Sequence, residues 1–570
     1  MENYLNLRKL TEGEPYAKYR MAIWLYLFLL IFEGAIRKWI LPGLATPLLV
    51  VRDPIVIWLY CVALQKGWLE NTYVKVMCFI STVSLILTLV IGHQNLLVAI
   101  FGWRIYFFHF PMIFIMAELL SRRDILKMGK FILYVSIPMT ILIVLQFKSP
   151  QTAWVNMGVG GEGSAGFQGA MGYMRPPGTF SFTAGYVCYQ AIVGCYLLYF
   201  LFENKLLPKE LQISQLALYI MLACYLIAIP TSISRTNFFQ TLVFLFFLFI
   251  AALRKNSLKG KFLNFVIIGI VVISIMLSFG IGNDAIAAFS ERFVTANKSE
   301  GGMEGVVGDR YAGGLFAAFT DFNIPFFGYG LGLGTNVGAK LMGGDMYSFG
   351  FNGEVEWTRI VGECGHIIGW SIIFLRLIFS IDVFKKSYRS LVDNEDLLPW
   401  MLCAGMLLTV PQGQWAIPTN LGFSILSGGL TLAAVKRSLD LGTGNIHMTA
   451  SAHLFHHYLY IDFVNSPGTD INFIIVLSQY KGCLYSCIFQ LVMYLANLYH
   501  EVTPLLMVKR EQTALFVFLG DGQIGATVCV FTSFVIAEVG FRQELMLVST
   551  LVPKKFACKH VLLVNGIAFA

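Results

Sequence analysis

Long apolar stretches recur through the first 437 residues of this chain and limit what it can fold into. A helix needs about 20 consecutive apolar residues to cross the roughly 30 Å hydrocarbon layer of a membrane. Only 13% of the 570 residues are charged, about half the share found in soluble domains. The sequence therefore predicts an all-α polytopic membrane protein with about twelve transmembrane helices. The predicted helices lie at 21–41, 46–65, 74–92, 95–120, 131–147, 183–203, 213–231, 236–253, 263–282, 366–383, 398–412 and 417–435.

The predicted organisation has five parts. Residues 1–20 form a charged N-terminal segment in the cytoplasm, and 21–282 carry the first nine predicted helices. Residues 283–365 are too polar and glycine-rich to cross a membrane, so we expect one large loop there. Residues 366–437 carry the last three helices. The composition then changes abruptly, and we interpret 438–570 as an atypical tail that comes from a shifted reading frame or a fused sequence.

Basic residues are concentrated in alternate connections between the predicted helices, as in membrane proteins whose cytoplasmic loops are rich in Lys and Arg. With the N-terminus in the cytoplasm, the large loop faces outward. The charges are scattered, so nucleic-acid binding is not expected. No Asp-x-Asp motif occurs in the large loop, and we expect neither a metal nor a cofactor. The short outward connections hold only Arg37, Lys38, Lys148, Arg175 and Arg235.

The large loop contains a predicted helix start at Asp309 and Arg310. Such a helix would lie at the membrane surface with its apolar side down. Its free N–H groups and the Arg310 guanidinium would suit a phosphate or diphosphate. The alternative is a surface arginine on an amphipathic helix.

A glycine-rich segment with Gly328, Gly330 and Gly332 follows in the same loop. No Gly-Lys-Ser/Thr sequence follows it and no βαβ pattern surrounds it, so a nucleotide cradle is not supported. Two interpretations remain open. The glycines form a flexible turn at the membrane surface, or they let backbone N–H groups approach a lipid head group.

Arg235 lies in a very short outward connection among small hydroxyl residues, Ser232 and Ser234 before it and Thr236 after it. An arginine near the end of a transmembrane helix often extends its charge to the interface, which is one interpretation. The other is that the hydroxyl groups orient the guanidinium or share its anionic ligand.

These motifs, taken together, resemble the O-antigen ligase and O-antigen polymerase family. The resemblance covers roughly residues 20–437 and depends on the order and placement of motifs that are individually weak. The matching elements are the Ser-x-Ser-Arg turn at Ser232–Arg235, the later outer loop with Arg310, the Pro-x-x-Gly-x-Gly-x-Gly sequence at 325–332, the glycines with Glu363 between Gly362 and Gly369, and the Gly-Thr-Phe element after Arg175.

The resemblance implies a metal-independent glycosyltransferase at the outer, periplasmic face of the bacterial inner membrane. Its donor would be an undecaprenyl-diphosphate-linked oligosaccharide, and its acceptor another glycan or lipid A core. From their chemistry, Arg235 and Arg310 are predicted to stabilise the leaving diphosphate. The predicted substrate-binding residues are Arg175, Ser232, Ser234, Gly328, Gly330, Gly332 and Glu354.

The chain departs from the family at one position. Ligases of the family carry a His-Asn pair before the last helix of the loop, whereas this chain has Asn352-Gly353-Glu354-Val355-Glu356-Trp357. Glu356 is predicted to accept the proton of the acceptor hydroxyl in place of the histidine. The alternative for both glutamates is the preference for acidic residues at helix starts. The missing histidine favours a polymerase over a ligase.

Several charged residues lie within or at the ends of the first apolar stretches, and we expect them to pair with one another rather than contact substrate. These residues are Glu33, Arg37, Arg52, Asp53, Arg104 and His109. The rival function is a polytopic transporter or flippase of lipid-linked glycans. Transporters usually show internal repeats, and none is visible in this sequence.

Overall fold

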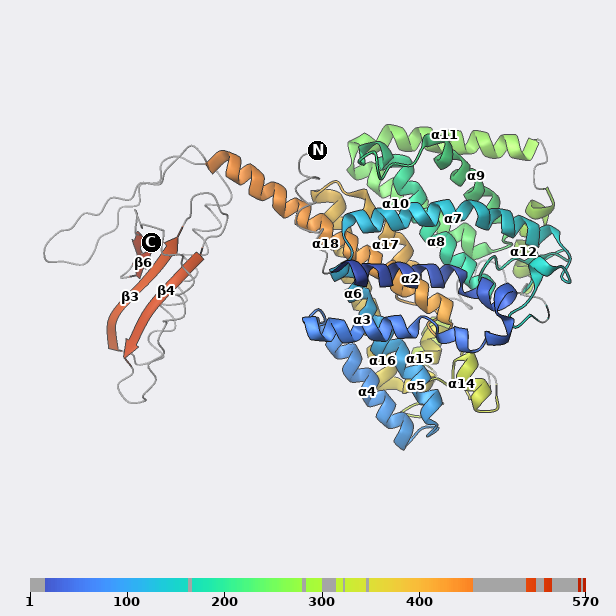
Figure 1. Ribbon diagram of the computed structural model, residues 1–570, viewed down its shortest axis with the longest axis horizontal. Coiled ribbons are helices and arrows are strands. Elements are labelled where there is room, and N and C mark those ends of the chain that lie inside the picture. Colours follow the sequence, from blue (N-terminus) through green and yellow to red (C-terminus); the bar gives the residue numbers. More distant parts are fainter. Residues whose placement is uncertain are drawn as a thin grey trace. The chain divides into compact units, whose positions relative to one another are not determined.

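Figure 1 shows the computed structural model of the protein. Contacts divide the chain into two compact units, Met1–Gly442 and Thr443–Ala570. In the second unit, β3 (Lys509–Phe518) pairs antiparallel with β4 (Thr527–Val535), and β5 (Leu562–Val564) with β6 (Ile567–Phe569). The structure describes residues 16–161, 163, 167–278, 283–299, 314–320, 323–344, 348–454, 509–518, 527–535, 562–564 and 567–569.

The first unit is helical. Its only strands among the described residues are β1 (Phe167–Gln168) and β2 (Met174–Arg175), which form a short hairpin. The α-helices are α2 (Ala17–Ala35), α3 (Asp53–Lys66), α4 (Thr72–Val90), α5 (Leu96–Arg104), α6 (Phe110–Leu119), α7 (Arg122–Lys148), α8 (Thr183–Glu203), α9 (Gln215–Thr231), α10 (Arg235–Arg254), α11 (Asn256–Ser278), α12 (Asn283–Ser299), α13 (Gly314–Thr320), α14 (Asn336–Leu341), α15 (Glu356–Cys364), α16 (His366–Asp393), α17 (Leu397–Thr409) and α18 (Pro418–Leu454).

Short 3-10 and π segments extend or join several of these helices. Two π segments carry charged residues: η2 (Ile36–Ile40) continues α2, and η5 (Ile105–His109) joins α5 to α6. Local π-helical geometry is rare and is often found at functional sites. The 3-10 segments are η3 (Pro42–Leu44), η4 (Pro47–Val50), η6 (Trp154–Asn156) and η7 (Asn204–Leu206).

Among the described residues, eight helical segments are long and apolar enough to cross a membrane. Two further predicted helices, 213–231 and 398–412, fall on the shorter apolar helices α9 and α17. The predicted helices 263–282 and 417–435 overlap α11 and α18. The all-α membrane architecture is therefore confirmed, whereas the count of twelve crossings and the outward loop stay predictions. The eight segments are Ala17–Ile40, Pro47–Lys66, Thr72–Val90, Leu96–Leu119, Arg122–Lys148, Thr183–Leu206, Arg235–Arg254 and His366–Asp393.

Polar side chains at the helix starts fix where several of these helices begin. Asn71 accepts from the backbone N–H of Tyr73 to cap α4, and Asn95 caps α5 in the same way. Ser121 and Asp124 form a reciprocal capping box at the start of α7. The core is built around α8, which packs against α7, α9, α10 and α17 (Figure 1).

Alternate connections between the helices contact one another in two separate sets. In one set, Arg122 pairs with Asp396 at 2.5 Å, and Lys255 pairs with Glu203 at 3.1 Å. Lys255 also donates to the carbonyl of Glu395, next to Asp396. These contacts join the connections that precede α7, follow α8, precede α11 and precede α17. Such sorting is expected of helices that run through the bundle in alternate directions.

The second set of connections lies at the other ends of the helices and includes the predicted site. Arg37 donates to the Ser181 hydroxyl at 2.9 Å, and the Trp357 indole donates to the Pro411 carbonyl at 3.0 Å. His93, between α4 and α5, contacts the Leu331 carbonyl at 2.9 Å. Segments that lie far apart in the sequence therefore meet at this end of the bundle.

The predicted pairing of charges in the first helices is confirmed. Glu33 bridges Arg37 and Arg52, with N–O distances of 3.4 and 3.3 Å. Asp53 binds Arg104 at 2.6 Å and the imidazole of His109 at 3.1 Å. A buried charge is costly unless it is paired, which explains why these side chains find partners across helices.

Candidate functional site

The three predicted glycines let their loop pack tightly against α4, α5 and the start of α16. Gly328, Gly330 and Gly332 have φ of 73°, 114° and 90°, in the left-handed region that favours glycine. A Cβ on Gly332 would overlap the Val98 carbonyl, and one on Gly330 would lie 2.6 Å from the His93 ring. The backbone of Gly330 and Gly332 therefore closely approaches other parts of the protein.

Hydrogen bonds anchor this glycine-rich loop at several points. The Leu331 N–H donates to the Thr88 hydroxyl at 3.0 Å, and the Gly330 N–H to the Glu363 carbonyl at 3.0 Å. The Gly334 N–H donates to the Glu363 carboxylate at 2.8 Å. These hydrogen bonds hold the backbone of the loop against α4 and α15.

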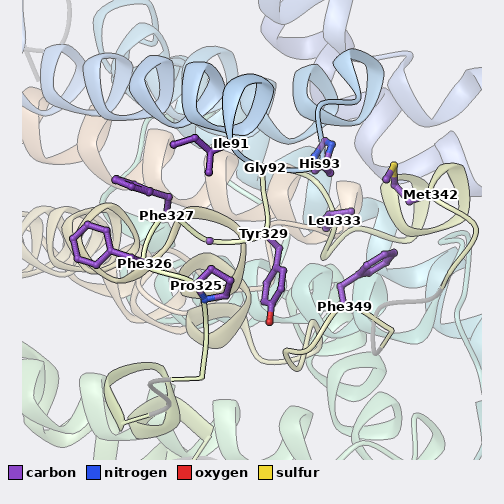
Figure 2. Close-up of a pocket in the computed structure, with 11 residues that line it drawn as sticks. Ile91, Gly92, His93, Pro325, Phe326, Phe327, Tyr329, Leu333, Met342 and Phe349 are labelled. Carbon is purple, nitrogen blue, oxygen red and sulfur yellow. The ribbon is translucent and has the colours of Figure 1, made fainter.

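A cavity of about 420 Å³ opens between this loop and the connection from α4 to α5 (Figure 2). His93 is the one lining residue with a titratable imidazole. Its Nδ1 accepts from the Asn95 N–H at 3.0 Å, so the Nε2–H donates to the Leu331 carbonyl. Both ring nitrogens are occupied, and the rest of the lining is largely apolar and aromatic. The lining consists of Ile91, Gly92, His93, Pro325, Phe326, Phe327, Gly328, Tyr329, Leu333, Met342 and Phe349.

Glu356 begins α15 and is the centre of a buried ion-pair network. The residue is only 2% exposed. The Arg359 guanidinium binds both of its carboxylate oxygens at 3.0 Å, and Arg376 binds Oε1 at 2.6 Å. The backbone N–H of Trp415 donates to Oε2 at 3.1 Å. Each carboxylate oxygen therefore accepts two hydrogen bonds, a geometry that favours a positioning role over proton acceptance.

The partners of Glu356 extend the network to neighbouring elements. Arg359 also binds Glu363 at 2.8 Å and the Tyr106 hydroxyl of η5 at 3.0 Å. Arg376 donates to the carbonyls of Val410 and Gly413 in the connection before α18. The network thereby fixes α15 and the glycine-rich loop relative to α16 and this connection.

Two carboxylates in this network determine the pKa of the buried Arg359 guanidinium. Burial alone would lower the pKa of Arg359, but the Glu356 and Glu363 carboxylates outweigh it and raise that pKa well above its usual range. Arg359 therefore stays protonated wherever the protein is folded.

Glu354, two residues before Glu356, has a different environment. Its side chain is exposed, whereas its backbone is held by the Asn352 side chain and by Gln414. A carboxylate in this position can meet a solute at the end of the bundle. The two predicted glutamates therefore have different surroundings despite their proximity.

The turn before α10 is the second group of predicted residues. Ile233 has a φ of 45°, which is strained for a β-branched side chain and is typical of functional turns. The Ser232 hydroxyl donates to the Ile229 carbonyl at 2.9 Å and accepts from the Asn237 amide at 2.8 Å. Ser232 therefore stabilises the turn, and its buried hydroxyl already has two partners.

Ser234 and Arg235 form the start of α10. Ser234 is the N-cap residue, yet its side chain makes no capping hydrogen bond. It is 2% exposed, and its hydroxyl has no hydrogen-bond partner among the described residues. Arg235 is the first helical residue and is half-buried. The first N–H groups of a helix and its positive dipole end favour an anion, and the Arg235 charge reinforces this preference.

The structure places Arg175 beside this turn. Arg175 lies on β2, paired with Phe167 of β1. A Cβ on Gly169, directly after β1, would lie 2.8 Å from the Ile233 side chain and 3.4 Å from the Arg175 side chain. The aliphatic part of Arg175 therefore lies close to Ile233, the residue between Ser232 and Ser234.

Arg310 and Asp309 lie outside the described residues, and α13 is described from Gly314 onward. Arg359 and Arg376 were not predicted as site residues, and Glu363 was named only as part of a sequence element. The ion pairs of Arg359 with Glu356 and Glu363 could be predicted from the sequence, because these residues have the i, i+3 and i, i+4 spacings of helix ion pairs. Arg376 lies on another helix, and no local spacing reveals its pairing with Glu356.

Fold and site together define a polytopic helical membrane protein with two polar groups of residues among interhelical connections. A scan against protein-family models finds no match, and a search of curated proteins finds none either. Among the described residues, no group of three or more His, Cys, Asp or Glu side chains is arranged to hold a metal ion.

Proposed function

We propose that this protein is a glycosyltransferase that acts on undecaprenyl-diphosphate-linked glycans at the outer face of the bacterial cytoplasmic membrane. It polymerises or ligates O-antigen or exopolysaccharide units. The start of α10 carries the proposal, because an uncapped helix N-terminus, the buried Ser234 hydroxyl and Arg235 meet there. Arg175 lies on the hairpin that contacts Ile233. These groups suit the diphosphate of a lipid-linked donor.

The proposed reaction transfers the glycan from diphosphate to a hydroxyl group. The acceptor oxygen attacks the anomeric carbon, the bond from that carbon to the diphosphate oxygen breaks, and the diphosphate leaves with the electron pair. Arg235 stabilises the negative charge that develops on the leaving group, and Arg310 of the large loop adds a second guanidinium. A carboxylate takes the hydroxyl proton. Glu354 is exposed and Glu356 is saturated, so the geometry favours Glu354 for this step.

The cavity beside the glycine-rich loop supports a lipid-linked substrate. Among the described residues, its lining offers four aromatic side chains, from Phe326, Phe327, Tyr329 and Phe349, and no acidic or basic side chain apart from His93 (Figure 2). A sugar or phosphate there would lose hydrogen bonds to water without replacement, which is unfavourable. The cavity therefore suits a hydrocarbon chain.

The proposed orientation can be tested with single cysteines. Thr152, between α7 and α8, and Lys209, between α8 and α9, are both exposed and belong to connections at opposite ends of α8. In a background without native cysteines, Thr152→Cys is expected to react with an impermeant thiol reagent in cells with a permeabilised outer membrane. Lys209→Cys is expected to react only after lysis. The reverse pattern would place the proposed site in the cytoplasm and refute its orientation.

One observation favours the transporter alternative. Asp53, Arg104 and His109 form ion pairs within the apolar helices, and ionisable groups in such positions often mark transport pathways. Incubation of purified protein with an undecaprenyl-diphosphate-linked oligosaccharide separates the two functions. A glycosyltransferase produces a new glycosidic bond and free undecaprenyl diphosphate, whereas a transporter leaves the donor covalently intact.

A further inference from the structure

Lys38 is a fully buried lysine at the end of the first transmembrane segment, in the π segment η2. Its Nζ donates to the carbonyls of Gly178 at 2.7 Å and Phe180 at 3.0 Å. Neither contact is with a carboxylate, and the described ion pairs do not include Lys38. Burying a lysine nitrogen without a counter-charge is costly, and its described partners are these two carbonyls and the Trp39 ring, whose centroid lies 4.4 Å away.

The segment that Lys38 holds is also fixed from other sides. The Gly178 N–H donates to the Gln146 side chain at 2.8 Å, and the Thr179 hydroxyl donates to the Ile31 carbonyl at 2.6 Å. Arg37 binds the Ser181 hydroxyl. A Cβ on Gly34 would overlap the Thr179 carbonyl, so α2 lies directly against this turn. Residues 178–181 are therefore held in place by contacts with α2, η2 and α7.

Two consecutive prolines connect this fixed segment to Arg175. Pro176 and Pro177 have restricted φ angles and separate Arg175 from Gly178 by a stiff spacer. At the other end of that spacer, the hairpin that carries Arg175 contacts Ile233, the residue before Ser234. The contacts that hold Gly178 therefore restrict the position of Arg175 relative to Ile233 and the start of α10.

We propose that Lys38 is a positioning residue that holds Arg175 at the anion site formed by Ser234 and Arg235. The inference rests on the proposed function, because it takes the diphosphate of the lipid-linked donor as the ligand. Lysine suits this role because the nitrogen at the end of its long side chain has at least two N–H donors, which reach two carbonyls on one turn. Lys38 itself does not contact the ligand.

The test is the binding of undecaprenyl diphosphate to the purified full-length protein in detergent, measured for four variants. Lys38→Met and Arg175→Ala are each expected to raise Kd about tenfold or more, the effect of losing one charge-assisted contact. The double variant is expected to bind no worse than Arg175→Ala alone, because Lys38 acts through Arg175. Lys255→Met is the control, since it removes a buried lysine from the other set of connections and is expected to leave Kd unchanged.

Each outcome decides the inference. Additive losses in the double variant, or a folded Lys38→Met protein with the wild-type Kd, would overturn it. If Lys38→Met does not accumulate, Gln146→Met loosens the same turn without removing a charge and should raise Kd through Arg175 in the same way. A wild-type protein that binds the lipid but transfers no glycan refutes the glycosyltransferase and leaves the role of Lys38 intact. A wild-type protein that does not bind the lipid overturns both.

Discussion

Replacement of Arg235 by alanine is expected to slow glycan transfer by on the order of 10²-fold to 10³-fold, the usual cost of removing one donor that stabilises a transition state. Lysine should restore little activity, because it lacks the planar pair of N–H donors that matches a diphosphate. Arg310→Ala is expected to have an effect of the same size. Initial rates with an undecaprenyl-diphosphate-linked oligosaccharide, at matched protein abundance, measure these effects.

Arg254→Ala is the matched control for Arg235→Ala. Arg254 is the last residue of α10 and is exposed at the opposite end of the same helix. Its loss removes the same charge without touching the proposed anion site, so transfer should stay at the wild-type rate. Equal rates for Arg235→Ala, Arg310→Ala and wild type would show that neither arginine holds the diphosphate.

Glu356→Ala is expected to destabilise the protein by about 3–5 kcal/mol, because it leaves Arg359 and Arg376 buried without their shared carboxylate. Unfolding in detergent, followed by temperature or denaturant, measures the loss. Glu354→Ala is the control and should change the free energy of unfolding little, because the Glu354 side chain is exposed.

Glu356→Gln separates the positioning role from the predicted role as a base. The amide preserves the shape of the side chain but weakens the binding of two guanidinium groups, so a positioning role predicts a less stable protein. A base predicts a protein of wild-type stability with almost no transfer. The second result would restore Glu356 as the proton acceptor and contradict the role inferred from its saturated oxygens.

The sequence predicts the helices well where lipid contact requires an unbroken apolar run. The predicted helix at 95–120 corresponds to the segment Leu96–Leu119. Asn95 caps the start of this segment, and Ser121 caps the start of the next helix, α7. The π segment within it was not predictable, because hydrophobic periodicity does not report a local change of helix type. The predicted helix at 366–383 ends early, since α16 continues through polar residues to Asp393 beyond its apolar part.

The candidate site was predictable only in part. The short connection before α10 and its hydroxyl residues single out Arg235 from local sequence. Its proximity to Arg175 depends on a contact between Gly169 and Ile233, which no local pattern encodes. The contacts of Glu356 with Arg376 and Trp415 are not predictable from local sequence, because these two partners come from other parts of the fold.

Reconstitution of the purified full-length protein in liposomes tests the central claim most directly. The liposomes contain an undecaprenyl-diphosphate-linked oligosaccharide and an acceptor glycan, and mass spectrometry follows the size of the glycans and the release of undecaprenyl diphosphate. The glycosyltransferase account predicts longer glycans, or a glycosylated acceptor, together with one undecaprenyl diphosphate for each bond formed, and loss of both products in Arg235→Ala. Donor that stays covalently intact in the presence of active, correctly folded wild-type protein, whether or not it changes leaflet, would contradict the account.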